Sequence, residues 1–426
     1  MSRDEPRRAR RPDDATPAPQ VEYAPPAVHN APGPRDHPLD LLGTLVCILV
    51  VLLTIGFVCV RMFKTTFVTA GSVATPDRSM LTSANAVSNT GFAQSWAAVA
   101  DYQPSGHVLL ALLAIAGAGT SMVGGGMLLS RALGMNIGWR TLLATSVGIV
   151  GLGLIASATL VLGSGLDPIS AVTGTGLSVH SAYTPAQVTL HAISLPLFVL
   201  GGLGPVMLIG IGRAIAGREI PTILRQTIAW TLATYIVSVI VLAPQIEKLF
   251  RDARPQAIAA AAAHALNARG LGLPVGQLAD LPTSAVWTLV PLMLLGLGPA
   301  GSTGGLSCLP IALLASMAVA LIRGQSPSRL AGVAVVWVTA QVVLVFVTHL
   351  ILLSYQPQLQ PDRTFFIAVS AVCNTGLAHD PLTVIGTAGF TLAAAMMLGK
   401  LLPLAMLAWM AALSEKTPAA QMSSTR

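Results

Sequence analysis

The sequence predicts an all-α membrane protein with eight transmembrane helices, and three observations support this. Hydrophobic residues make up 53% of the 426 residues and charged residues only 10%, whereas about a quarter of a typical soluble protein is charged. The mean hydropathy is +0.71, and the 40 glycines fit membrane helices, in which Gly is more frequent than in soluble ones. Finally, eight segments stay apolar over roughly the 20 residues that a helix needs to cross a bilayer.

We expect the spans, in chain order, at residues 41–60, 107–130, 141–163, 189–213, 227–246, 286–321, 329–354 and 386–413. The sixth is too long for one straight helix and holds Pro299, Gly301, Gly304 and Gly305 near its middle, which predicts a broken helix. Irregular backbone at membrane depth survives only where protein or a water-filled cavity satisfies its polar groups. This segment is therefore expected to border a pore or a binding site.

The two ends of the chain are predicted to be cytoplasmic. Residues 1–38 are rich in Arg and poor in large apolar residues, which predicts a disordered tail, and residues 415–426 form a short C-terminal tail. A targeting peptide is the alternative for the first segment, but no short apolar stretch with a cleavage site follows its arginines. Of the 24 Lys and Arg, 15 lie on the side of this tail and 7 on the opposite side, and such an excess marks the cytoplasmic side.

The net charge of +7 does not indicate a nucleic-acid partner, because six of the cations lie in the first 38 residues. The four cysteines lack the paired spacing of a disulfide framework or a zinc site.

A short segment recurs after the first, third, fifth and seventh spans. Three copies share the pattern Ala-Val-x-x-Thr-Gly-(Phe/Leu), at 86–92, 171–177 and 371–377. The third copy in chain order, at 264–273, is degenerate, and its glycine is either Gly270 or Gly272. Each copy follows a stretch too short to cross a membrane and precedes a full span. We therefore predict four helix–pore loop–helix repeats around one central pore, at 39–135, 136–222, 223–325 and 326–414.

Physical chemistry suggests what such loops do. A half-helix that ends near the bilayer midplane needs partners for its carbonyls, and Gly reaches backbone conformations that turn them toward a central axis. Four such loops make a ring of oxygens that can replace the hydration shell of a potassium ion. The candidate filter residues are Asn89, Thr90, Gly91, Thr175, Gly176, Gly270, Gly272, Asn374, Thr375 and Gly376. The alternative is that the Thr-Gly pairs are ordinary helix C-caps or helix-contact glycines, which four copies at matching positions disfavour.

Several motifs carry a resemblance to a known family. They are Ser88–Phe92, Thr175–Ser178, Ala268–Gly272, Val369–Leu377, Gly201–Gly204 and Gly301–Gly305 (Gly-Ser-Thr-Gly-Gly). Together they resemble the pore loops, a glycine-rich helix and the gating motif of the Trk/Ktr/HKT superfamily of potassium transporters, over residues 40 to 413. The match is closest to the bacterial Ktr/Trk membrane subunits, and its third loop favours Gly272 over Gly270.

The resemblance implies potassium uptake through a pore of the bacterial inner membrane, gated by Gly301, Ser302, Thr303, Gly304 and Gly305. It implies no cofactor in this chain, with potassium as the substrate. It also implies a homodimer, embedded in lipid, on a separate cytoplasmic nucleotide-binding regulatory ring of the RCK type. A Ser in place of the first-loop glycine goes with sodium permeability in this family, so Gly91 favours potassium.

The sequence departs from the family pattern at three places. Leu306-Ser307-Cys308 replaces a stretch that usually contains Lys, Lys400 stands where the family usually has Arg, and Leu273 replaces Phe.

Two cations, Arg269 and Lys400, fall inside the spans or loops. An ionisable group there costs at least about 2.5–3.5 kcal/mol on insertion scales, so each is a functional candidate affecting pore electrostatics. Lys400 either snorkels to the cytoplasmic surface or lies near the pore below the filter. Arg269 is expected to brace its loop from behind, since a cation on the axis would repel potassium. Asp380, after the fourth loop, either attracts cations to the outer mouth or is a solvated residue.

Other functions are disfavoured. A secondary transporter of a small solute would have two related halves and membrane-embedded carboxylates, whereas the spans contain four quarter-repeats and no Asp or Glu. A sodium-permeable cation transporter stays open as an alternative. The spans lack the nucleophile–base pairs of a membrane enzyme, so we expect no enzymatic activity.

Overall fold

The computed structural model describes residues 37–67, 75–92, 102–159, 167–178, 184, 187–250, 253–276, 278–379 and 386–415. Within these ranges the chain forms helices and loops but no β-strand, as the sequence predicts. Seven of the described helices are long and apolar enough to cross a membrane. The chain is thus an all-helical membrane protein. The two predicted tails lie almost wholly outside the described residues.

The long helices match the predicted spans. In chain order they are α1 (Pro38–Met62), α4 (Pro104–Gly119) extended by η3 (Thr120–Gly125) and α5 (Gly126–Ala132), α6 (Trp139–Thr159), η4 (Leu190–Ser194) with α8 (Leu195–Ile215), α9 (Thr222–Ile246) with η5 (Glu247–Phe250), α13 (Arg329–Tyr355) and α15 (Thr387–Glu415). Many large apolar side chains on them point outward, such as Val147, Leu232 and Leu350. Such outward apolar faces suit contact with lipid.

The predicted sixth span, 286–321, is not one helix. It forms α11 (Thr283–Leu294) and α12 (Leu309–Ile322), and residues 295–308 between them are not helical. The interruption lies where the sequence places Pro299 and the cluster of glycines. Proline lacks a backbone donor, and glycine is a poor helix former, so neither supports a continuous helix.

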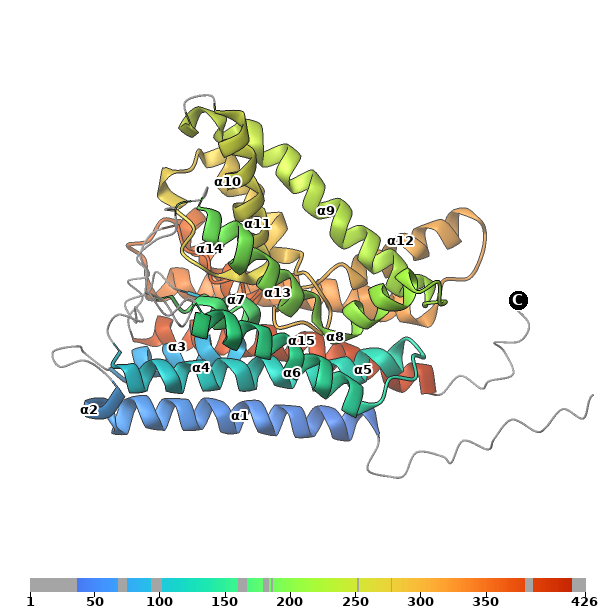
Figure 1. The fold of residues 1–426 in the computed structure, drawn as a ribbon, viewed down its shortest axis with the longest axis horizontal. Helices are drawn as coiled ribbons and strands as arrows, with labels where there is room; N and C mark the ends of the chain where they lie inside the picture. The colour runs from blue at the N-terminus through green and yellow to red at the C-terminus, as the bar shows by residue number, and fades with distance from the viewer. Residues whose placement is uncertain are drawn as a thin grey trace, which may run out of the picture.

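Shorter helices connect the long ones or pack against them. These are α2 (Lys64–Phe67), α3 (Pro76–Ser88), α7 (Asp167–Thr173), α10 (Arg254–Leu266) with η6 (Asn267–Leu271), η7 (Leu278–Asp280) and α14 (Pro361–Val372). The recurring segments of the sequence end four of them. Each of the four packs against its flanking helices: α3 on α1 and α4, α7 on α6 and α8, α10 chiefly on α9, and α14 on α13 and α15. In Figure 1 the labels of these four helices lie in the left half of the view, from α3 near the lower helices to α10 near the top.

The same backbone contact recurs in three places. A Cβ atom added to a glycine of a long helix would collide with the carbonyl oxygen of the Val in the Ala-Val pattern that precedes it. The pairs are Gly117 with Val87, Gly201 with Val172, and Gly399 with Val372. The three short helices therefore approach their following long helix equally closely, which only glycine allows.

The two ends of the described chain lie together. α1 begins and α15 ends at the same end of the molecule (Figure 1). Close to that end, the Ser414 Oγ donates a hydrogen bond of 2.9 Å to the Ala132 carbonyl. α15 also packs closely against α3 and α1, so the last long helix closes the assembly against the first.

Substitution of Gly399 by Ala tests the close approach. The new Cβ would overlap the Val372 carbonyl, and overpacking a filled interior costs about 1–3 kcal/mol. We expect a lower midpoint of thermal unfolding in detergent. Gly332→Ala is the control, because nothing lies within 4 Å of a Cβ there. Equal unfolding midpoints for the two variants would contradict this packing.

Candidate functional site

Three of the four recurring loops begin with the same helix-ending turn. In each, a Thr N–H donates to the carbonyl five residues earlier, and the residue before it donates to the carbonyl three residues earlier. The residue before the Thr has a left-handed backbone: Asn89 (φ 59°), Gly174 (φ 68°) and Asn374 (φ 51°). This is the Schellman arrangement, which Asn and Gly tolerate best. The Thr-Gly pairs thus do follow helix C-caps. A helix C-cap does not prevent the residues of the loop after it from binding an ion as well.

The loop after α10 reaches a similar path by a different turn. Its last turn, η6, is a π-helix, and both of its glycines have positive φ, 103° at Gly270 and 68° at Gly272. Gly270 thus takes the left-handed position that Asn89 takes in the first loop, and Gly272 follows two residues later, as Gly91 does. The third loop, whose sequence departs from the common pattern, therefore also differs from the other three loops in its hydrogen bonds.

The four loop glycines meet at one place. A Cβ atom built on Gly91 would lie 2.7 Å from the Gly272 Cα and 3.2 Å from the Gly176 nitrogen. One built on Gly376 would overlap the carbonyl group of Gly91. All four glycines have positive φ. Only hydrogen fits as the side chain at each position, and Gly272, not Gly270, contacts Gly91 and Gly176.

Side chains from the short helices hold these loops from behind. The Asn85 Oδ1 accepts hydrogen bonds from the N–H groups of Gly91, at 2.8 Å, and Phe92, at 3.0 Å. The Ser170 Oγ donates to the Leu177 carbonyl. Asn85 and Ser170 were not among the predicted site residues, but a signal was present: a polar residue directly precedes the Ala-Val pattern in both copies and again at Ser370.

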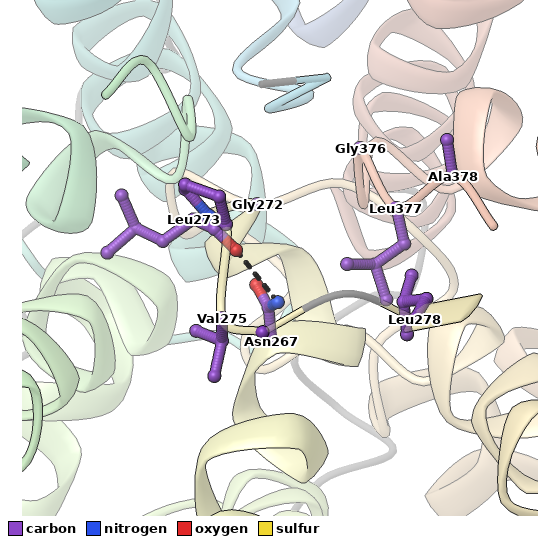
Figure 2. A pocket seen from close by; sticks show the side chains of 10 residues that line it. Asn267, Gly272, Leu273, Val275, Leu278, Gly376, Leu377 and Ala378 are labelled. Carbon is purple, nitrogen blue, oxygen red and sulfur yellow. Dashed lines mark hydrogen bonds between the residues drawn. The ribbon is translucent and has the colours of Figure 1, made fainter. Parts of the chain in front are cut away.

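A small pocket lies beside two of the glycines. Figure 2 shows Leu273 and Val275 on one side of it and Leu278 and Leu377 on the other, with the Asn267 Nδ2 donating to the Leu273 carbonyl at 2.9 Å. Gly272 and Gly376 line it as well, and its volume is about 10 Å³. That space suits roughly one water-sized sphere.

The interrupted segment, which we define as residues 295–308, lies against the other side of the loops. Atoms built as Cβ on Gly174 and Gly270 would come within 3.3 and 3.1 Å of the Thr303 side chain. The Ser302 N–H donates to the Gly201 carbonyl at 3.0 Å. Gly204, three residues on, has φ 73° and interrupts α8 just before Pro205. The predicted gating residues therefore contact the loops directly.

Lys400 joins the interrupted segment to the first loop. Its side chain is buried, with 3% exposed. The Nζ donates hydrogen bonds to the Asn89 Oδ1, at 2.9 Å, and to the Ser302 carbonyl, at 2.7 Å. The Asn89 Nδ2 in turn donates to the Ala114 carbonyl at 2.9 Å. This geometry favours a position beside the loops over snorkelling to the membrane surface.

Several buried oxygens in this region have no hydrogen-bond partner among the described residues. They are Ser302 Oγ, Thr303 Oγ1, Asn374 Oδ1 and Thr375 Oγ1. Buried polar atoms of folded proteins nearly always have partners, so such a group suits water or an ion.

Arg269 lies on the flank of its loop toward α9. Its guanidinium donates to the Thr231 carbonyl at 3.3 Å and to the Thr234 Oγ1 at 2.7 Å. Its side chain thus joins the third loop to α9, and it does not share hydrogen-bond partners with Lys400. Asp380 lies outside the described residues.

The N-terminal end of α3 is joined to the start of α15. The Asp77 Oδ2 accepts a hydrogen bond of 2.8 Å from the Gly386 N–H, just before α15. Burial works to raise the pKa of Asp77, but the hydrogen bonds that it accepts, this one included, outweigh burial and lower the pKa.

No family model and no curated protein sequence matches the chain. Among solved structures, the crystal structure of the potassium transporter TrkH from Vibrio parahaemolyticus matches it with a TM-score of 0.69 at 15% identity. The match covers 89% of this chain and 85% of TrkH. The chain has the TrkH fold. The all-helical, TrkH-like fold that the sequence resemblance implies is thereby confirmed over most of this chain.

Asn85→Leu tests the support behind the first loop. It leaves the N–H groups of Gly91 and Phe92 without an acceptor, at a cost of about 1–3 kcal/mol for each unsatisfied group. We expect faster amide hydrogen exchange at residues 90–92 and a lower unfolding midpoint. Ser83→Ala, on the same helix, removes only a bond from the Ser83 Oγ to the Ser79 carbonyl and should leave residues 90–92 protected. Unchanged exchange in Asn85→Leu would show that Asn85 does not hold the loop.

Proposed function

We propose that this protein carries potassium ions across the bacterial inner membrane through one channel-like pore per chain. The observation that carries the proposal is the meeting of Gly91, Gly176, Gly272 and Gly376 at one place. Carbonyl oxygens around these glycines would replace the hydration shell of the ion. The C-terminal ends of α3, α7, α10 and α14 lead into the loops, and their dipoles would add negative potential there.

The pore implies eight crossings arranged as four repeats, with α11 and α12 together making one interrupted crossing. The repeated glycine–valine contacts and the repeated helix-ending turns support this arrangement for repeats one, two and four. The third repeat departs most, since its loop leaves a π-helical turn and its second crossing is interrupted.

The gate in this proposal is the interrupted segment, at Gly301–Gly305. Thr303 lies against Gly174 and Gly270 and would obstruct the path directly beside the filter. Lys400 holds Ser302 near the first loop and places a positive charge where a cation would pass. Displacement of this segment would open the path, and the unpartnered oxygens of Ser302 and Thr303 would then meet water or the ion.

Transport rather than enzymatic catalysis is supported by the match to a transporter fold. Coupled transport by alternating access would require carboxylates inside the spans. Among the described residues, the buried carboxylates are Asp77 and Asp167, and each lies at the start of a short helix rather than within a long one.

The orientation in the membrane, the driving force and the partners belong to the same proposal. The excess of Lys and Arg on one side supports cytoplasmic termini, so the negative interior would drive uptake with about 2.3 kcal/mol per charge per 100 mV. The sequence resemblance supports a homodimer on a separate nucleotide-binding ring.

The direct test is rubidium-86 uptake into liposomes that contain this chain alone, under an imposed inside-negative potential and with sodium as competitor. Saturable uptake that potassium inhibits more strongly than sodium is expected. Equal inhibition by both ions would favour the sodium-permeable alternative. Because a closed gate would also abolish flux, a silent protein is retested as Lys400→Met, and silence in both would contradict the proposal.

Gly91→Ser tests the filter. The serine Cβ would press on the Gly272 backbone at a φ of 87°, and a disturbance of 1.4 kcal/mol changes an equilibrium about tenfold. We expect the potassium-to-sodium permeability ratio to fall by about this factor. Gly217→Ser is the matched control, because Gly217 also has a positive φ but open space around its Cβ. An unaltered ratio in a folded, active Gly91→Ser protein would remove Gly91 from the filter.

Lys400→Met tests the gate. Methionine fills similar space but offers the Ser302 carbonyl and the Asn89 Oδ1 no donor. Hydrogen bonds to charged groups contribute about 1.5–3 kcal/mol each, so we expect resting rubidium uptake to rise about tenfold. Lys400→Arg keeps the charge and should stay close to the parent. Reduced uptake in Lys400→Met, with the fold intact, would show that Lys400 does not hold the gate shut.

A further inference from the structure

Arg269 is a buried cation that the proposed ion path does not use. Only 1% of its surface is exposed, and it forms no ion pair with any described residue. Its hydrogen-bond acceptors are neutral oxygens of α9. Burying a charge without a counter-ion costs several kcal/mol of desolvation free energy, so packing alone does not account for the position of Arg269.

The same two residues of α9 that hold Arg269 also hold the interrupted segment. The Thr231 hydroxyl donates mainly to the Thr227 carbonyl at 2.8 Å, and its Oγ1 also lies 3.3 Å from the Leu297 carbonyl, near the start of that segment. The Thr234 Oγ1 lies 3.8 Å from the Cys308 Sγ, at the end of the segment. One turn of one helix therefore contacts the third pore loop and both flanks of residues 295–308.

The direction of the bonds at Thr234 follows from its chemistry. A hydroxyl has one hydrogen to donate and two lone pairs to accept with. The Thr234 Oγ1 donates to the Trp230 carbonyl at 2.7 Å and accepts from the Arg269 Nη2. Its remaining lone pair therefore accepts from the Cys308 thiol. Thr234 is a junction at which the guanidinium and the thiol share one oxygen.

We propose that Arg269 is a positioning residue that couples the third pore loop to the interrupted segment, the proposed gate, through Thr231 and Thr234. Arg269 fixes the loop of Gly272 against α9, while Leu297 and Cys308 fix the gating segment against the same turn. Displacement of the segment would disturb the acceptors of Arg269 and thus the position of Gly272. This inference rests on the proposed function, and it adds that opening the gate changes the filter at its third loop.

Thr234→Val is the central variant, because valine keeps the shape of threonine and removes the shared oxygen. We expect a fall of about tenfold in the potassium-to-sodium permeability ratio, since the loss of a hydrogen bond to a charged group shifts an equilibrium by at least about this factor. Thr234→Ser restores the hydroxyl and should restore the ratio. Thr227→Val is the matched control: Thr227 is buried on the same helix, and its hydroxyl donates only to the Ile223 carbonyl.

Amide hydrogen exchange provides a readout that does not depend on transport. Arg269→Gln should raise amide exchange in residues 267–273. It should also raise exchange in residues 296–308, although the hydrogen bonds that Arg269 donates go to α9 and not to that segment. Cys308→Ala, on the other side of Thr234, should raise exchange in the same two regions. Thr227→Val should raise it in neither.

Loosening of 267–273 alone in Arg269→Gln, together with an unchanged permeability ratio in Thr234→Val, would overturn the coupling and leave Arg269 as a local brace. If the parent and Lys400→Met both carry no potassium, the proposed function fails. In that case, a rise in amide exchange in both regions of Arg269→Gln would still show the mechanical link between them. A rise in only one region would reject both proposals.

Discussion

The structure depends on the requirement that backbone polar groups at membrane depth find partners within the protein. The long helices satisfy it with their own hydrogen bonds, but the four loops and the interrupted segment cannot. Their groups are satisfied one by one instead. The Asn85 side chain accepts from two N–H groups of the first loop, and the Gly201 carbonyl accepts from Ser302. These polar contacts bring the non-helical segments together, and so place them in the middle of the helical assembly.

Glycine is needed wherever those segments approach one another. Gly91, Gly176, Gly272 and Gly376 leave no room for a side chain, and Gly117, Gly201 and Gly399 let three short helices press their last turns against the long helices. In the first, second and fourth loops the short helix reaches the common point with its flank close to the helix that follows, whereas α10 reaches it while packed chiefly against α9. The positive φ of the loop glycines then turns the chain at that point.

The sequence predicted the long helices well, because an apolar stretch of about 20 residues has few structural alternatives. The repeated Ala-Val-x-x-Thr-Gly pattern likewise identified the loops that the structure brings together. The details that the sequence did not predict depend on contacts between distant residues. Asn85 differs from Ser170 in residue type, so its role was visible only as a polar position before each pattern. The sequence left open where the Lys400 side chain lies, because a snorkelling lysine and a buried one can have the same neighbours in sequence. Only the positions of its acceptors, Asn89 and Ser302, distinguish the two cases. The π-helical turn at Asn267–Leu271 has no clear sequence signal at all.

The two buried cations illustrate how position determines the effect of a charge. Both Lys400 and Arg269 are held by neutral oxygens, and neither is paired with a carboxylate among the described residues. The attraction of an acidic partner therefore does not cancel either charge. Lys400 turns toward the loops and the interrupted segment, where an uncancelled charge would oppose a passing cation. Arg269 turns away to α9, where its planar guanidinium can bridge two acceptors that a lysine ammonium would reach less well. In the proposed cation pore, two positive charges fit beside the four loops because Lys400 acts on the path and Arg269 is directed away from it.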